Sequence, residues 1–573
     1  MSKIINLFDV KSKYQAINLI ILMTLASILE LLGIGFVILV LNSFLGINDI
    51  YPSFIETLLN YFSPRENHES VHNVLFLIFV IFTIKLLIVI FVSFKENSFH
   101  ANFREKITNK MYHNFLNRNV LSLLKKNSAI YLRNFTEELN LSMLFFVSLL
   151  KIILDFIILF AFLTFLLFFN ITITLSVFFI FTLIGIVYFY NIKDKLSSWA
   201  ISGLQNRKKR IQFINESFLA IKSIKILSRE NFFFKKLQQE NRIFRNISFK
   251  VNFLKSIPPN FFEYILLVSI LILFFYLIGQ NFSDEKIIQI LSVYALVSFR
   301  IVPIINRVIG NSQHLRYTYP SVKKLVTEID YKIIKKKSLI NKINFKKSIK
   351  LKFKHFSFSQ LKKPLFKNFS LEIKKNSKIG IIGPSGSGKS TIIDIICGFR
   401  NFENGIFKVD DKNVYNDIES WQKTIGYIPQ NIVIFNDTLR NNILFGSDRK
   451  KFSDKIINRL IDKVELNYLL KSSSKGLSQI ISQDGQNISG GEKQRIGIAR
   501  ALINNPEIII LDEATSGLDV LTEKNVLSTI RRLNKTVIIV SHRLSALSFC
   551  DKIYLVQKNT LKNLNINSIK KFF

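Results

Sequence analysis

The chain has 573 residues, 49% of them hydrophobic, and its formal net charge at pH 7 is +38. This length allows two or more domains, and most long apolar runs lie before residue 310, which predicts a membrane part followed by a soluble part. No nucleic-acid recognition module accompanies the basic charge, which excludes nucleic acid as an expected partner and favours anionic membrane lipid or an anionic substrate.

Six apolar segments are long enough to span a bilayer. They lie near residues 17–44, 73–94, 143–169, 171–192, 261–280 and 286–309, with a tight outer turn expected at Asn170. No short apolar stretch with a small-residue cleavage site begins the chain, so we interpret the first segment as an uncleaved membrane helix. The sequence therefore predicts an all-α transmembrane domain of six helices over residues 1–325.

Basic residues between the segments indicate the orientation. The loop 45–72 has one, Arg65, whereas the loops 95–142 and 193–255 are rich in lysine and arginine. The positive-inside rule therefore puts both long loops and both termini in the cytoplasm. In the outer loop, residues 54–62 fit one face of a short interfacial helix that caps the bundle.

Both cytoplasmic loops have helical periodicity, so we expect them to extend the membrane helices beyond the bilayer. Residues 127–139 favour a short bent helix, and residues 211–226 continue the helical pattern of the second loop. These helical ends could contact a soluble domain or could form a solvated stalk, and spacing alone leaves both alternatives open.

Several charged residues fall inside the predicted spans, where charge is costly and usually faces the bundle interior or an aqueous path: Glu30, Lys85, Lys151, Asp155, Glu263 and Arg300. Lys151 and Asp155 lie one helical turn apart, so we predict that they pair with each other. Lys85 and Arg300 could instead attract an anionic head group, or pair within the bundle.

A basic linker is expected over residues 326–348. From residue 349 the pattern changes to short β-rich runs and amphipathic helices, which predicts an α/β P-loop nucleotide-binding domain over residues 349–573. Its phosphate loop has a strand–turn–helix context, in which backbone N–H groups and a helix N-terminus surround a phosphate chain. We assign ATP binding to Gly383, Pro384, Ser385, Gly386, Ser387, Gly388, Lys389, Ser390 and Thr391.

Four side chains have distinct expected roles at this site. Lys389 reaches the β- and γ-phosphates, and the Ser390 hydroxyl is a ligand of Mg²⁺. Residues 508–511 predict an apolar strand that ends in Asp512 and Glu513. Asp512 is placed to hold Mg²⁺, and Glu513 to orient and deprotonate an attacking water.

The only cysteines, Cys397 and Cys550, are interpreted as buried thiols in a reducing compartment.

Further motifs resemble the ATP-binding cassette (ABC) family. Residues 488–495 resemble its signature sequence, residues 427–430 its glutamine loop, residues 516–519 its D-loop and residues 541–543 its switch-histidine segment. Six helices ahead of one such domain resemble an exporter-type half transporter, which implies an ATPase coupled to transport. The resemblance also implies that Gln430 contacts Mg²⁺ and acts with Glu513 and His542 on the γ-phosphate.

The resemblance implies a head-to-tail pair of chains, either a homodimer or a heterodimer. Each ATP would lie between the phosphate loop of one chain and Ser489, Gly490 and Gly491 of the other. The segments near 127–139 and 211–226 resemble the family's coupling helices. The signature has Ile488 and Glu492 where Leu and Gln are usual, but the residues that face phosphate remain, so we expect hydrolysis at both sites.

The adenine contact departs from the family's pattern. The usual stacking aromatic residue falls near Gln360, which leaves Phe356 or Phe358 as substitutes.

The arrangement of Glu30, Lys85, Arg300 and the amphipathic outer loop is similar to bacterial lipid-linked oligosaccharide flippases. This resemblance implies flipping of a polyprenyl-pyrophosphate-linked oligosaccharide across a bacterial inner membrane, for glycosylation. A general exporter of lipids, drugs or peptides is the alternative within the class. An ATP-gated membrane regulator without turnover is the alternative from another class, and Glu513 and His542 argue against it.

Overall fold

A computed structural model describes residues 10–44, 68–124, 128–169, 171–280, 282–330, 343–356, 365–402, 405–515, 517–557 and 559–564. The chain divides into two compact units, one of residues 1–118 and 122–333, the other of residues 119–121 and 334–573. The predicted helix over 54–62 and the predicted turn at Asn170 lie outside the described residues.

In the described part of the first unit, six helices are 31 to 50 residues long: α2 (Val10–Phe44), α4 (His68–Leu116), α7 (Leu139–Phe169), α8 (Ile171–Leu219), α10 (Glu230–Gly279) and α11 (Asp284–Ile329). Each of these helices contains one of the six predicted apolar segments, and no segment extends more than one residue beyond its helix. Helices α4, α8 and α10 continue far beyond their apolar segments, which confirms the predicted helical extensions. The short helices are α5 (Val120–Leu124), α6 (Ser128–Arg133), the π-helix η1 (Asn134–Glu138) and α9 (Ile221–Ile226).

Four stretches of the described residues are long and apolar enough to cross a membrane: Ile78–Leu116, Ile130–Leu167, Asn260–Gly279 and Ile290–Ile329. Their outer surfaces are correspondingly apolar. On α4, Phe76, Phe79 and Phe94 are 68–69% exposed. A soluble protein rarely exposes so many large apolar side chains together, whereas lipid chains solvate them well.

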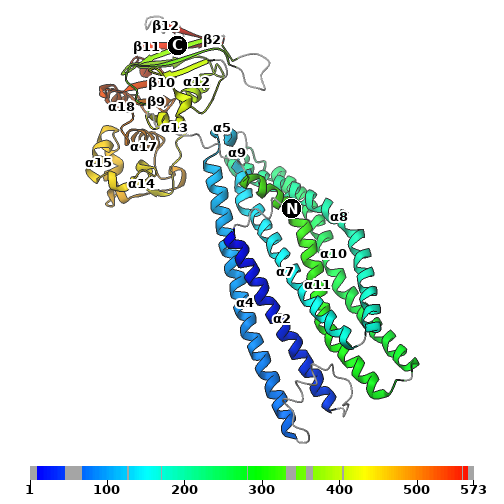
Figure 1. Cartoon of the computed structure of the whole chain (residues 1–573). Coiled ribbons are helices and arrows are strands. Elements are labelled where there is room, and N and C mark those ends of the chain that lie inside the picture. Colours follow the sequence, from blue (N-terminus) through cyan, green and yellow to red (C-terminus); the bar gives the residue numbers. More distant parts are fainter. Residues whose placement is uncertain are drawn as a thin grey trace. The chain divides into compact units, whose positions relative to one another are not determined.

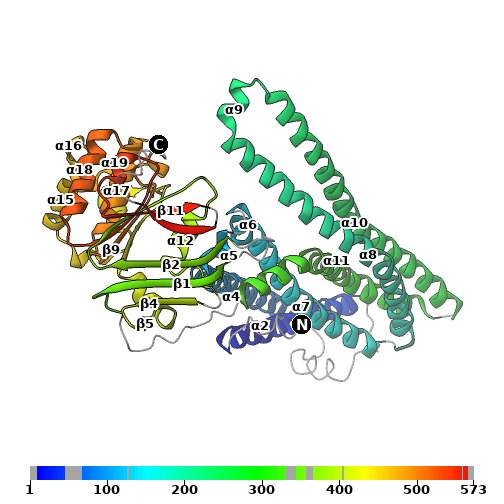
Figure 2. The same cartoon turned by 90° about the horizontal axis from the view of Figure 1, so that it is seen from above.

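The membrane helices pack in pairs, with α7 against α11, α2 against α4 and α8 against α10. The members of each pair run side by side in Figure 1. Gly33 permits the close approach of α2 to α4, since a Cβ at this position would lie 2.9 Å from the Phe82 ring. Helices α8 and α10 form a long hairpin that α9 closes (Figure 2).

The predicted pairing of Lys151 with Asp155 is wrong. The Lys151 ammonium lies 3.7 Å from Glu96 of α4, and the Asp155 carboxylate lies 3.0 Å from the Arg307 guanidinium of α11. Both residues belong to α7, which packs against α4 and α11. Because those neighbouring helices supply oppositely charged groups, contacts between helices replace the contact along one helix.

The second unit contains a six-stranded sheet with the order β12-β11-β3-β10-β9-β6. Strands β11, β3, β10, β9 and β6 are parallel, and β12 is antiparallel to β11. Their bounds are β3 (Lys378–Ile382), β6 (Ile425–Ile428), β9 (Ile508–Asp512), β10 (Thr536–Val540), β11 (Lys552–Gln557) and β12 (Thr560–Leu564). Alternate residues of β9 enter different cores, Ile508 and Ile510 on one face and Ile509 and Leu511 on the other, so the sheet is covered on both sides.

A second, antiparallel sheet has the order β2-β1-β4-β5, and β7 pairs with β8. These strands are β1 (Ser348–Phe356), β2 (Phe366–Lys374), β4 (Gly405–Val409), β5 (Lys412–Asn413), β7 (Asp437–Thr438) and β8 (Ile480–Ile481). The helices are α12 (Lys389–Ile396), α13 (Ile418–Gln422), α14 (Leu439–Leu444), α15 (Asp454–Lys463), α16 (Asn467–Lys471), α17 (Gly490–Leu502), α18 (Val520–Arg532) and α19 (Leu544–Leu547). The predicted fold class, a six-helix membrane domain followed by an α/β P-loop domain, is confirmed.

The strand register determines which loops meet. Val540 of β10 is paired with Asp512 of β9 on one side and with Ile381 of β3 on the other, and Ile428 of β6 is paired with Leu511. The carboxyl ends of these four parallel strands therefore lie at one edge of the sheet. In open α/β sheets this edge is where ligands bind.

Candidate functional site

The phosphate loop, residues 383–388, connects β3 to α12 at this edge. Gly386 and Gly388 have φ angles of +77° and +102°, which side chains rarely permit. A Cβ at Gly388 would also lie 2.6 Å from the Phe366 ring. The loop can therefore turn tightly and direct its backbone N–H groups into one concavity.

Lys389, the first residue of α12, is buried, and its Nζ donates to the carbonyl oxygens of Gly383 at 2.7 Å and Pro384 at 3.0 Å. Burial lowers the pKa of the Lys389 ammonium below its ordinary value, and the carboxylates of Glu513 and Asp512 oppose this shift. The lysine is therefore held over the loop, within electrostatic reach of both acids.

The other loop residues suit a phosphate ligand. Ser387 Oγ is buried and makes no hydrogen bond within the described part of the chain, which is expected of a group that bonds to a ligand. Thr391 is buried within α12. Four residues present exposed surface: Pro384, Ser385, Gly386 and Ser390.

Asp512 ends β9, and the Tyr427 hydroxyl of β6 donates to its Oδ2 at 3.3 Å. Burial raises the pKa of the Asp512 carboxyl above its ordinary value, and Glu513 and Asp394 add to the shift. Tyr427 was not predicted from the sequence as a contact of Asp512. Its position in the glutamine-loop motif, at the end of a parallel strand, is the signal that could have revealed it.

Glu513 is held between the two other residues that were assigned to hydrolysis. Gln430 Nε2 donates to Glu513 Oε2 at 2.8 Å, and His542 Nε2 lies 3.3 Å from Glu513 Oε1. The backbone of Glu513 adopts φ +52°, and its N–H donates to the carbonyl oxygen of Val540. This left-handed conformation turns the chain at the end of β9. The structure thus brings Gln430, Glu513 and His542 together from three separate loops.

The residues that were assigned to Mg²⁺ are a hydroxyl, an amide and a carboxylate: Ser390, Gln430 and Asp512. No group of three or more His, Cys, Asp or Glu side chains that could hold a metal occurs among the residues that the structure describes. A few oxygen ligands suit Mg²⁺, which typically binds one or two carboxylates and completes its shell with water and substrate phosphates. The donor set therefore fits Mg²⁺ delivered together with a nucleotide.

The signature segment begins helix α17. Ser489 caps this helix, and its hydroxyl accepts from the Glu492 N–H at 3.2 Å while Glu492 Oε2 accepts from the Ser489 N–H at 2.7 Å. This reciprocal capping box gives a physical role to Glu492, which departs from the family's usual Gln. A Cβ at Gly490 would meet no atom within 4 Å, so Gly490 borders open space. No hydrogen bond or ion pair links residues 489–491 to the phosphate loop within the described chain.

Family models match both units. The model described as the ABC transporter transmembrane region matches residues 32–302, and the model described as the ABC transporter matches residues 366–516. The chain belongs to the ABC transporter family. Its order, a transmembrane region followed by one ATP-binding domain, is that of an exporter-type half transporter.

Known ABC proteins resemble this transporter to different extents. It is 40% identical over 218 residues to the mitochondrial iron-sulfur clusters transporter ATM1 of Debaryomyces hansenii. These 218 residues are 37% of this chain and 31% of that protein. It is 34% identical over 223 residues to the ATP-dependent lipid A-core flippase of Pasteurella multocida, 38% of each chain. It is 35% identical over 258 residues to a putative export ATP-binding/permease protein of Rickettsia prowazekii, 43% of each chain. The transporter thus spans less than half the length of these curated relatives.

A solved structure of a bacterial Atm1-family ABC exporter with ATP bound matches nearly the whole fold. The TM-score is 0.78, with 98% of this chain and 96% of that chain covered, at 18% sequence identity. This likeness shows the fold alone.

The adenine contact of this ABC transporter differs from one sequence expectation. Gln360 and Phe358 lie outside the described residues. Phe356 is 8% exposed, and its ring centre lies 6.0 Å from that of Phe353 and 6.4 Å from that of Phe366. It packs in the core of the antiparallel sheet, so it is not placed to stack on adenine.

Proposed function

We propose that this protein is a membrane ATPase in which two chains couple ATP hydrolysis to transmembrane transport. The contact of Glu513 with both Gln430 and His542 carries the proposal. A carboxylate at this place can accept a proton from water, and the two side chains that contact it hold its orientation. We further propose a bacterial inner membrane location, with the ATP-binding unit in the cytoplasm.

The binding roles follow from the chain's own groups. The N–H groups of residues 385–388 and the start of α12 would hold the phosphates, together with Lys389. Ser390, Gln430 and Asp512 would hold Mg²⁺, which neutralises phosphate charge when bound. Glu513 would accept the proton of the attacking water, and His542 would contact the γ-phosphate. Ser489, Gly490 and Gly491 of a second copy would complete each site, since Gly490 faces open space in this chain.

The cargo proposal rests on a cavity inside the membrane unit. It has a volume of about 310 Å³ and lies between α2, α4, α7 and α11. Among the described residues, three basic and two acidic side chains line it: Lys85, Glu96, Lys151, Asp155 and Arg307. Such a charged cavity at membrane depth favours a charged ligand over a purely apolar one.

In both ion pairs of this cavity, the basic side chain is more exposed than the acidic side chain. The side chain of Arg307 is 51% exposed, whereas that of its partner Asp155 is 6% exposed. Lys151 is likewise more exposed than Glu96. The less exposed carboxylates thus hold the cations in place, and the cations retain N–H donors for an anion. A pyrophosphate head group has this chemistry, so we propose a polyprenyl-pyrophosphate-linked oligosaccharide as the cargo.

Arg300 does not belong to this set. Lys85 lines the cavity, but Arg300 is exposed on α11 and is absent from its lining. Of the two residues that could attract an anionic head group, Lys85 lines this cavity together with Lys151 and Arg307, and Arg300 does not. Arg307 was not predicted from the sequence, although it lies seven residues beyond Arg300 on the same helix.

A second cavity supports the alternative, a general exporter of lipids. It has a volume of about 360 Å³ between α7, α8, α10 and α11, and its lining is almost wholly apolar. Its few polar groups include Thr174 and Tyr294, whose hydroxyls bond to each other at 2.7 Å. An acyl chain would suit this cavity without any charged head group.

Purified protein in liposomes tests the function. Wild-type protein should move a fluorescent polyprenyl-pyrophosphate glycan across the bilayer only when ATP and Mg²⁺ are present, and Glu513→Gln should retain ATP binding but lose hydrolysis and movement. The double variant Asp155→Asn with Arg307→Gln removes one ion pair without leaving a buried charge unpaired, and should slow movement about tenfold. Lys235→Gln, an exposed lysine of α10 outside the cavity, is the matched control.

Each result discriminates between the proposals. Hydrolysis by Glu513→Gln at the wild-type rate would reject Glu513 as the base. Equal movement of the glycan by the cavity variant and by wild type would reject the cationic site. ATP-driven movement of a labelled phospholipid without movement of the glycan would favour the general lipid exporter.

A further inference from the structure

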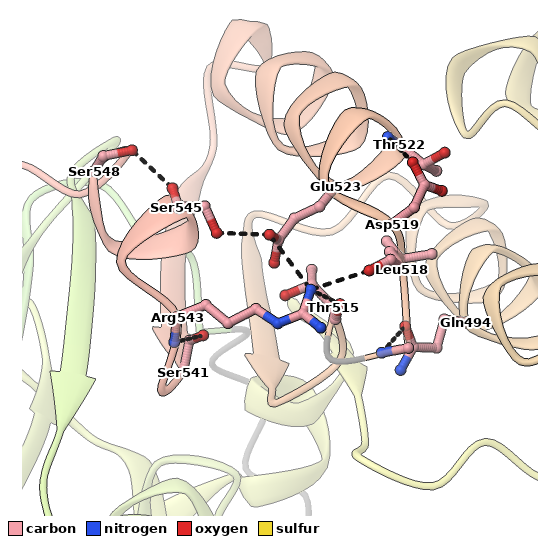
Figure 3. Close-up of polar contacts among 11 residues, drawn as sticks. Gln494, Thr515, Leu518, Asp519, Thr522, Glu523, Ser541, Arg543, Ser545 and Ser548 are labelled. Atoms are coloured by element: carbon pink, nitrogen blue, oxygen red, sulfur yellow. Dashed lines mark hydrogen bonds and ion pairs between the residues drawn. The ribbon is translucent and has the colours of Figure 1, made fainter. Parts of the chain in front are cut away.

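A polar cluster surrounds Arg543 (Figure 3), the residue that follows His542 in the sequence. Its centre is Arg543, whose Nη1 donates to the carbonyl oxygens of Leu518 at 3.0 Å and Thr515 at 3.3 Å. Thr515 follows Glu513 by two residues, and Leu518 precedes helix α18. The Arg543 guanidinium therefore connects the segment that follows Glu513 to the segment that contains His542.

Glu523 fixes the orientation of this guanidinium. Its carboxylate is 1% exposed in the first turn of α18, and Oε2 lies 3.6 Å from Arg543 Nη1 and accepts from Ser545 Oγ at 2.6 Å. Oε1 is buried and makes no hydrogen bond within the described residues. A buried carboxylate is costly unless a cation compensates it, so Glu523 holds Arg543 in one place.

The segment between Glu513 and α18 is also held by α17, the helix that begins at the signature segment. Gln494 of α17 accepts the N–H of Gly517 through Oε1 at 3.0 Å. The contacts thus run from Gln494 through Gly517 and Leu518 to Arg543, beside His542. All of them lie within the second unit, and Figure 3 shows both ends of this chain of contacts.

We propose that Arg543 is a positioning residue that couples helix α17 to His542. The inference rests on the proposed function, in which α17 begins at the ATP of the partner copy and His542 acts on the chain's own ATP. A conformational change at the N-terminus of α17 is then transmitted to His542 through the backbone carbonyl groups of Thr515 and Leu518, which Arg543 contacts. The two ATP sites of a dimer are therefore coupled through each chain, and ATP turnover is cooperative.

Arginine suits this role because its planar guanidinium can serve two carbonyl oxygens and one carboxylate at once. Lysine retains the charge, but its side chain is one atom shorter and does not bring its ammonium to the position of Nη1, so it replaces only some of these contacts. Because the contacts described for Arg543 go to Thr515, Leu518 and Glu523 rather than to the phosphate loop, its loss should change the rate of turnover rather than the binding of ATP.

Steady-state ATP hydrolysis by the full-length protein in liposomes tests the coupling. Arg543→Ala should lower kcat about tenfold, the size of a typical coupling between sites. Its KM for ATP should stay within about twofold, and its Hill coefficient should fall toward 1. Arg543→Lys should recover part of kcat. Arg532→Ala, which removes an exposed arginine of α18, is the matched control and should leave all three quantities unchanged.

A structural role is separated from a positioning role by a second variant. Arg543→Ala leaves the buried Glu523 carboxylate uncompensated, so its Tm should fall. Adding Glu523→Gln removes that charge and keeps an acceptor for Ser545, so Tm should return while kcat stays low. Recovery of kcat together with Tm would overturn the proposal.

The remaining outcomes are also decisive. An active wild type whose kcat and Hill coefficient are unchanged in Arg543→Ala would overturn this inference alone. A wild type that does not turn over ATP would overturn the proposed function, and this inference with it.

Discussion

Gly388 shows how strictly the phosphate loop constrains single residues. Its φ is +102°, and a Cβ would lie 2.6 Å from the Phe366 ring and 3.2 Å from Leu365. Phe366 is fully buried in β2, so it has little room to move. Backbone strain and steric overlap therefore act together at this position.

We predict that Gly388→Ala lowers the free energy of unfolding by about 2–4 kcal/mol, the sum of a strained φ and an overpacked contact. ATP binding should weaken with it, because the loop must open to relieve the contact. The matched control is Gly386→Ala, where φ is +77° but a Cβ would meet no atom within 4 Å. Denaturant titration and binding of a fluorescent ATP analogue measure both effects. Equal losses in the two variants would show that the contact with Phe366 contributes nothing.

At the scale of the elements, one carboxylate holds the start of β1 against the turn between β4 and β5. Asp410 accepts the N–H groups of Lys346, Lys347 and Ser348 at 2.9, 2.7 and 2.9 Å. Burial, the largest single influence, raises the pKa of Asp410, but these three hydrogen bonds together lower it below its ordinary value. The ionised form is therefore the one that the fold prefers.

The pH dependence follows from the direction of this shift. Because the pKa of Asp410 is depressed in the folded protein, its stabilising effect is complete above the ordinary carboxyl pKa and is lost as the pH falls through the folded value. We predict that Asp410→Asn lowers the free energy of unfolding by about 1–2 kcal/mol at pH 7. The difference from wild type should shrink as the pH falls below about 4.

Chemical denaturation at several pH values measures this difference. Asp411→Asn, at the exposed neighbouring carboxylate, is the control and should have little effect at any pH. A loss in Asp410→Asn that stayed constant with pH would assign the effect to side-chain shape rather than to charge.

At the scale of the whole molecule, the decisive question is whether two chains share each ATP site. Glu513 and the Gly490 segment lie in different loops of one chain, with Gly490 facing open space. If the sites are composite, a chain with Glu513→Gln and a chain with Gly490→Asp are each inactive as homodimers. A mixed dimer contains one site in which both halves are intact.

We predict that differently tagged mixed dimers recover ATP hydrolysis, up to about half of the wild-type rate if one of two symmetric sites is restored. Both parent homodimers serve as controls. Since a Cβ at Gly490 meets no atom within 4 Å, the aspartate should not unfold the chain. A mixed dimer no more active than its parents would exclude a composite site that turns over ATP independently of the other site.

Contiguous motifs were predictable from the sequence because their chemistry depends on neighbouring residues. Residues 383–391 read as a strand–turn–helix phosphate loop, and β3 and α12 flank it as predicted. The six apolar segments likewise predicted six helices, because spanning a bilayer requires long apolar runs. The positions of Glu513, Gln430 and His542 were each predicted, but only from separate motifs and a family resemblance.

Partners that are distant in sequence were decided by the tertiary structure alone. Sheet register brings Gln430 to Glu513 and Tyr427 to Asp512 across more than 80 residues. Helix packing gives Lys151 and Asp155 partners on α4 and α11 in place of each other. Local periodicity describes what a residue contacts along its own element. Which other element supplies the opposing charge depends on how strands pair and helices pack, and no single stretch of sequence specifies that choice.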